Sequence, residues 1–181
     1  VKQLVDIAQQ QQTFQEPYPF ADKKAGKKSK TTVLVLWRSL LDKIKHEVLY
    51  DEVLLGHVAD MLSIMACTKH RGVRHTGVEI AMATMFKLAE LLAELKALHD
   101  NKTRQQSGKK KNAGSMPAAL AKELGEIDEK TEALTIMMNT LFQDIFVPRF
   151  RDTCPEIRRA CVEAYGKCLP IVDDWWAAPK L

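Results

Sequence analysis

Apolar residues recur at steps of three and four along nearly the whole chain. This spacing places them on one face of an α-helix, whereas a half-buried β-strand would alternate apolar and polar residues with a period of two. No stretch has the pattern of a β-hairpin or of a strand–helix–strand unit. The sequence therefore predicts an all-α fold.

The periodicity divides the chain into helical segments joined mainly by short corners. Asp51 stands at the expected N-cap of the third segment. Because short connections favour antiparallel neighbours, the second and third segments are expected to pack against each other. Long amphipathic helices in antiparallel pairs are typical of an α-solenoid, and a compact helical bundle is the alternative. The expected helices cover residues 1–12, 27–48, 51–67, 76–106 and 117–146. A last helix is expected to start near Pro155, with an apolar face that includes Ile157 and Cys168.

The chain has 181 residues and 46% hydrophobic content, which is enough to bury one core. We therefore expect residues 1–181 to form one helical unit. Glycine, serine and lysine concentrate in residues 105–116, where we expect a mobile surface loop. The chain starts at Val1 and ends in "DDWWAAPKL", which favours a piece of a longer protein.

Cysteine and hydropathy patterns exclude several classes of protein. Four cysteines without framework spacing favour free thiols in a reducing compartment. Cys154, Cys161 and Cys168 are spaced by seven, which on a helix separates them by about 10 Å, too far to share one zinc ion. They are expected on or near a buried stripe. No apolar run approaches the roughly 20 residues of a membrane span.

No motif for catalysis or nucleotide binding is present in the sequence. The carboxylates and histidines do not have the spacing of a convergent site. The sequence thus predicts a protein that is not an enzyme and that uses no metal, cofactor or small-molecule substrate.

Basic residues cluster at three expected helix corners, although the net charge is only +4. If the helices alternate in direction, corners at one end can form a positive track facing a phosphate backbone. No recognition helix or stacking platform is apparent, so contact with double-stranded DNA would be independent of base sequence. An ordinary solvated surface is the alternative for each cluster. The candidate DNA-binding residues are Lys27, Lys28, Lys30, Lys69, Arg71, Arg74, Arg149 and Arg151.

Five short motifs resemble, in order and spacing, the stromal antigen (stromalin, SA/STAG) family of HEAT-repeat cohesin subunits. They are "YDE" at 50–52, "RGVRHT" at 71–76, "DNKTRQ" at 100–105, "MMNTLF" at 137–142 and "FVPRFRDTCPEIRRACVEAYG" at 146–166. The resemblance implies a HEAT-like α-solenoid in the nucleus, on chromosomes, acting in sister-chromatid cohesion. It also implies association with the cohesin kleisin subunit, the SMC ATPases and double-stranded DNA, and it places the start of the stromalin conservative domain at 145–181.

The resemblance assigns a DNA-backbone role to particular basic residues. A lysine-rich stretch before "YDE" in the family matches Lys27, Lys28 and Lys30, and the arginine of "RHT" matches Arg74. Paired arginines at the start of the conservative domain match Arg149 and Arg151. The alternative function is a helical scaffold that binds a kleisin or another protein without contacting DNA.

Overall fold

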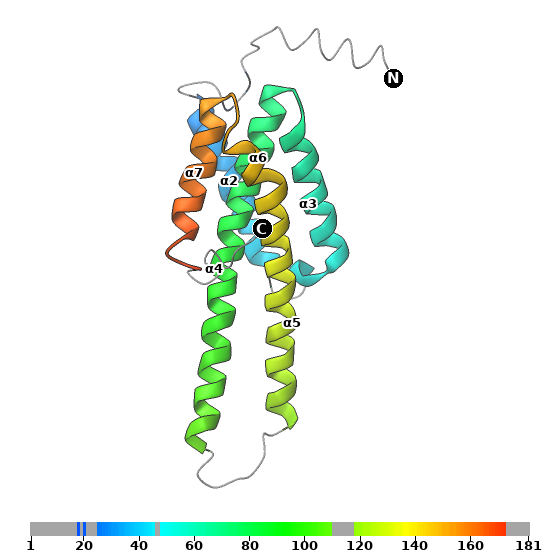
Figure 1. Cartoon of the computed structure of the whole chain (residues 1–181), viewed down its shortest axis with the longest axis vertical. Coiled ribbons are helices and arrows are strands. Elements are labelled where there is room, and N and C mark those ends of the chain that lie inside the picture. The colour runs from blue at the N-terminus through cyan, green and yellow to red at the C-terminus, as the bar shows by residue number, and fades with distance from the viewer. Residues whose placement is uncertain (1–17, 19, 21–24, 46–47, 110–117, 173–181) are drawn as a thin grey trace.

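The computed structural model describes residues 18, 20, 25–45, 48–109 and 118–172, and within them all regular structure is helical (Figure 1). The predicted all-α fold is confirmed. The predicted helix at 1–12 lies outside the described residues. The main helices are α2 (Ala25–Ile44), α3 (Glu52–Cys67), α4 (Arg71–Lys109), α5 (Ala118–Leu141) and α7 (Pro155–Cys168). The short elements are η2 (Val48–Tyr50), η3 (Phe142–Phe146) and α6 (Val147–Arg149).

The helices form two layers around α4. In the first layer α2 and α7 flank α4, and all three helices run in the same direction. Two ion pairs fix the direction of α2, since Lys30 near its start contacts Glu79 and Lys45 after its end lies 3.6 Å from Glu94. In the second layer α3 and α5 run the opposite way and contact each other. Stacked antiparallel pairs of this kind are the arrangement of an α-solenoid.

The predicted packing of the second helical segment against the third was wrong. α2 packs chiefly on α4, parallel to it, rather than on α3. The Trp37 indole donates a 2.8 Å hydrogen bond to the Thr84 hydroxyl, which ties the middle of α2 to α4. The short 45–51 connection sets the opposite directions of α2 and α3 but not their contact. The reason is that α4 is buried on several sides, so the apolar face of each neighbouring helix packs against α4.

The first half of α4 is the core of the molecule, because apolar and small residues of this helix are buried there on several of its sides. Its fully buried side chains include Val78, Met85 and Leu88. Gly77 lies close to α3, because a Cβ atom added at this position would lie 2.6 Å from the Met65 Cβ. Beyond this core α4 continues beside α5 and ends at Lys109. The predicted loop at 105–116 therefore overlaps the helix up to Lys109, and 110–117 lie outside the described residues.

Local sequence signals explain where several elements begin or change. The predicted N-cap is confirmed, since the Asp51 carboxylate accepts hydrogen bonds from the amides of Val53 (2.9 Å) and Leu54 (3.4 Å). The expected corner after Phe146 is displaced, because α5 continues through the π-helical turn η3 into α6. Pro148 lacks an N–H and would crowd the carbonyl four residues earlier, and a widened π turn just before it relieves that conflict.

The cysteines of α7 and of its N-cap belong to the core, as predicted. Cys154, Cys161 and Cys168 are all buried. Burial raises the pKa of Cys161 to about 12 and that of Cys168 to about 11, so both thiols stay protonated at neutral pH. Across the described ranges, no helix is both long and apolar enough to cross a bilayer.

Replacing Gly77 by alanine tests the close crossing of α3 and α4. The new methyl group would also meet the Ala66 backbone nitrogen at 3.0 Å, so the helices must separate. We expect the free energy of unfolding, measured in urea, to fall by about 1–3 kcal/mol. Gly125→Ala is the control, because nothing lies within 4 Å of its added Cβ. That variant should gain about 0.5–1 kcal/mol in the exposed helix. Equal effects of the two substitutions would contradict the crossing.

Candidate nucleic-acid interface

The three predicted basic corners lie at the same end of the molecule. They are the start of α2, the turn between α3 and α4, and the turn between α6 and α7 (Figure 1). The parallel directions of α2, α4 and α7 explain this, because each of these helices begins at that end. Direct contacts join the corners, including the 3.2 Å ion pair between Arg71 of α4 and Glu156 of α7.

At the start of α2, two lysines are exposed and the third is paired. Lys27 and Lys28 project from the first turns, and their carbonyl groups accept 2.9 Å hydrogen bonds from the Thr31 and Thr32 hydroxyls. The Lys30 side chain is 34% exposed and forms an ion pair with the buried Glu79 of α4. Lys30 therefore holds α2 to α4, whereas Lys27 and Lys28 face solvent.

At the corner between α3 and α4, Lys69 is exposed and both arginines are engaged. The Arg71 guanidinium lies 5.8 Å from the centre of the Tyr18 ring in addition to its pairing with Glu156. Arg74 is nearly buried, and its Nε is 3.0 Å from Oδ2 of Asp152. Arg74 also donates from Nη1 to the carbonyls of Thr68 (3.1 Å) and Lys69 (2.9 Å).

At the corner between α6 and α7, Asp152 is the acceptor on which the arginines converge. Its Oδ2 atom lies 3.0 Å from Nη1 of Arg149, and its Oδ1 atom accepts a 2.8 Å hydrogen bond from the Cys154 amide. Arg151 is exposed, with its guanidinium 4.8 Å from the centre of the Phe150 ring. One buried carboxylate thus serves two arginines from different helices, Arg74 and Arg149.

The surroundings of Asp152 keep it ionised. Burial by itself would raise the pKa of this carboxyl, but the Cys154 amide and the guanidiniums of Arg149 and Arg74 favour the charged form more strongly. The pKa of Asp152 is consequently below its ordinary value. Two cations share this one anion, so the cluster keeps a positive charge at the end of the molecule.

A second chain of contacts links the α2 corner to the arginines. The buried Glu79 carboxylate contacts Lys30 and also lies 3.2 Å from Nε2 of His75. Nδ1 of His75 is 2.9 Å from the Tyr18 hydroxyl, and the Tyr18 ring lies beside Arg71. Burial would raise the pKa of Glu79, but the contacts from His75 and Lys30 prevail and lower it. These contacts extend without a break from α2 across α4 to α7.

The structure divides the eight candidate cations into two sets of equal size. Lys30, Arg71, Arg74 and Arg149 form ion pairs with carboxylates. The second set, which we call the exposed cations, has its charged groups in solvent and consists of Lys27, Lys28, Lys69 and Arg151.

Sequence reasoning missed Arg158, which belongs to the same corner. This exposed residue donates from Nη1 to the carbonyls of Asp152 (2.7 Å) and Thr153 (3.1 Å). Its place in the first turn after Pro155, beside the predicted corner, was the available signal. The acidic partners Asp152 and Glu156 were not anticipated either, because a single carboxylate in a helix corner has no distinctive spacing.

Stacked pairs of antiparallel helices are the arrangement of helical-repeat proteins. Throughout the described part of the chain, no three His, Cys, Asp or Glu residues are grouped so that they could hold a metal ion. The described helices thus define an all-helical domain of stacked antiparallel helices, with the candidate basic residues at one end.

Comparison with known proteins identifies the family. Residues 16–126 match the STAG domain. Human cohesin subunit SA-3 is 31% identical over 134 residues, which are 71% of this chain and 11% of the relative. Cohesin subunit SA-1 of Xenopus laevis is 29% identical over 140 residues (75% and 11%), and sister-chromatid cohesion protein 3 of Arabidopsis thaliana is 26% identical over 153 residues (83% and 14%). The chain belongs to the STAG family of non-enzymatic cohesin SA/Scc3 subunits.

The chain corresponds to a small part of these relatives, since it spans only 11–14% of their length. The STAG match contains the candidate residues from Lys27 to Arg74, whereas Arg149 and Arg151 follow it. The start of the stromalin conservative domain at 145–181 remains a prediction.

Substituting Asp152 tests whether the arginine pairs build the corner. Asp152→Asn preserves an acceptor for the Cys154 amide but leaves Arg74 and Arg149 without their anion, so we expect a loss of about 3 kcal/mol in urea unfolding. Glu156→Gln is the control, because Glu156 and Arg71 are each 47% exposed. Its cost should stay below about 1 kcal/mol.

The pH dependence of stability provides a second readout for the same variant. The folded-state pKa of Asp152 is lowered, so its contribution is complete above the unfolded-state value of about 4 and is lost as pH falls through the folded-state value. The wild-type chain should therefore lose more stability than Asp152→Asn between neutral pH and acid. Parallel pH profiles for the two proteins would show that Asp152 has no such role.

Proposed function

We propose that this chain is part of a non-enzymatic cohesin subunit that acts in sister-chromatid cohesion and holds double-stranded DNA by its phosphate backbone. Membership of the STAG family supports the role in cohesion, together with a nuclear, chromosomal location. The cohesin kleisin subunit and the SMC ATPases are its proposed protein partners. The DNA contact is proposed to be independent of base sequence.

One observation carries the DNA proposal: the exposed cations come from three separate corners and lie at one end of the molecule. Lys27 and Lys28 project from α2, Lys69 from the α3–α4 turn and Arg151 from the α6–α7 turn. Charges distributed in this way can follow successive phosphates of a duplex, because the phosphates repeat at short, regular intervals along each strand. Few carboxylates oppose them, since Glu79, Asp152 and Glu156 are already paired.

The paired cations have a different part in the proposal. Arg74 and Arg149 are held by Asp152, and their guanidiniums shape the two turns that carry Lys69 and Arg151. Their excess positive charge adds to the local potential without a direct contact to phosphate. Direct phosphate contacts are therefore proposed for Lys27, Lys28, Lys69 and Arg151. An indirect role, through ion pairs and local charge, is proposed for Lys30, Arg71, Arg74 and Arg149.

The salt dependence of duplex binding tests the proposal. A labelled duplex of mixed sequence is titrated with the chain at several salt concentrations, and fluorescence anisotropy gives log K against log salt. Replacing all exposed cations by alanine should reduce the magnitude of the slope by about two to four, since each phosphate contact contributes roughly 0.9. Binding at low salt should weaken by more than about tenfold.

A matched variant separates this effect from net charge. Lys43, Arg104, Lys122 and Lys167 are also exposed, and replacing them by alanine removes the same three lysines and one arginine from other surfaces. This control should retain the wild-type slope. If both variants lose affinity equally, or neither does, the proposed interface is wrong, and a scaffold that binds protein partners without DNA becomes the better function.

A further inference from the structure

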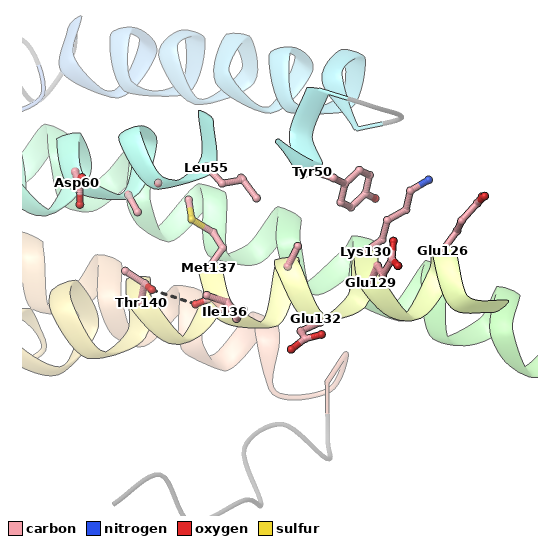
Figure 2. A pocket seen from close by; sticks show the side chains of 13 residues that line it. Tyr50, Leu55, Asp60, Glu126, Glu129, Lys130, Glu132, Ile136, Met137 and Thr140 are labelled. Atoms are coloured by element: carbon pink, nitrogen blue, oxygen red, sulfur yellow. Dashed lines mark hydrogen bonds between the residues drawn. The ribbon is translucent and has the colours of Figure 1, made fainter. Parts of the chain in front are cut away.

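A long groove runs between α3 and α5, in the layer opposite α2 and α7 (Figure 2). Its volume is about 930 Å³, which is in the range of ligand-binding clefts. Tyr50 lies near one end, and Asp60 of α3 and Thr140 of α5 lie near the other. None of the candidate DNA-binding residues lines this groove.

The groove has an apolar floor and one exposed apolar anchor. Leu55 and Met137 are buried between the two helices. Ile136 is 59% exposed at the groove, although an isoleucine gains stability by burial. An apolar side chain from a partner could cover Ile136 and rest on the floor beneath it.

The rim is acidic although the chain as a whole is basic. Asp60 stands on the α3 wall, and Glu126 and Glu129 stand on the α5 wall. Glu132 extends from the side of α5 that points away from α3 (Figure 2). The lining cation is Lys130, whose ammonium lies 5.2 Å from the centre of the Tyr50 ring. Glu126 also has an exposed neighbour, Lys122, at 3.9 Å.

This charge pattern selects the chemistry of the occupant. Carboxylates on both walls would repel the phosphates of a nucleic acid and attract lysine or arginine. An apolar floor between charged rims accepts a helix with one apolar stripe and basic flanks. On α5, the lining extends from Glu126 to Thr140, and 14 steps of helix cover about 21 Å, or four turns.

We propose that the α3–α5 groove docks a basic amphipathic helix of about four turns from a protein partner. The apolar stripe of that helix covers Ile136, and its lysine or arginine side chains reach Asp60 and Glu129. The groove and the DNA-binding end are separate surfaces, so one chain can hold a duplex and a basic protein segment together. The proposal does not depend on DNA binding.

A designed peptide tests the groove on the complete chain. The probe is a 16-residue helical peptide with leucine at the stripe positions and lysine on both flanks. One control peptide has the same composition in a scrambled order without a stripe, and another carries glutamate in place of lysine. Calorimetry at low and physiological salt should show that the probe binds and that neither control peptide does. The affinity for the probe should weaken as salt rises.

Groove variants locate the binding. Ile136→Ser should weaken the affinity for the probe peptide about tenfold. Val162→Ser, which alters an equally exposed (59%) residue on α7, should leave that affinity unchanged. Asp60→Asn combined with Glu129→Gln should weaken it about three- to tenfold and reduce its salt dependence. Asp144→Asn combined with Glu163→Gln, on exposed residues outside the groove, is the matched control.

Three results would overturn the proposal. They are equal binding of the scrambled peptide, an unchanged affinity in both groove variants, and tighter binding of the acidic peptide or of duplex DNA at the groove. Because the groove variants retain Lys27, Lys28, Lys69 and Arg151, their duplex affinity should equal that of the wild type. Failure of the groove and failure of the DNA interface are therefore distinguishable.

Discussion

Charges on the buried part of α4 require partners from the neighbouring helices, and those pairs determine how the helices align. Glu79 is neutralised by Lys30 of α2, and Lys87 lies 2.7 Å from Asp42 of the same helix. Arg74 is neutralised by Asp152, just before α7. An unpaired buried charge costs several kcal/mol, so a shift of either flanking helix along α4 is strongly disfavoured. The pairs thereby bring the starts of α2, α4 and α7 to one end.

This pairing also divides the basic residues into those that hold helices together and those that are exposed and proposed to contact DNA. Arginine suits the buried positions, because its planar guanidinium donates several hydrogen bonds at once, as Arg74 does to Asp152, Thr68 and Lys69. Lysine, with a compact and strongly hydrated charge, dominates the exposed positions. The motifs that resemble the STAG family contain residues of both kinds, so similarity in sequence alone does not separate structural cations from those proposed to contact DNA.

The helices, the Asp51 cap and the buried α7 cysteines were predictable, since each depends on local spacing or on a single residue type. The partner of α2 was not, because amphipathic spacing reveals an apolar face but not the helix that covers it. The continuation of α5 past Phe146 depends on a π turn that accommodates Pro148, and no local sequence pattern indicates such a turn. For the candidate site, the sequence indicated the basic corners, but burial of Asp152 decides which arginines remain available, and burial arises only from tertiary packing.

The most direct test places a photo-crosslinking amino acid at single positions and mixes each protein with duplex DNA. Residue 28 on α2, residue 69 in the α3–α4 turn and residue 151 before α7 sample the three corners, while residue 122 on α5 and residue 162 on α7 sample other surfaces. If the end of the molecule holds the phosphate backbone, DNA adducts form from all three corner positions and not from the other two. Adducts from positions 122 and 162 at equal yield, or from one corner alone, would contradict a continuous interface.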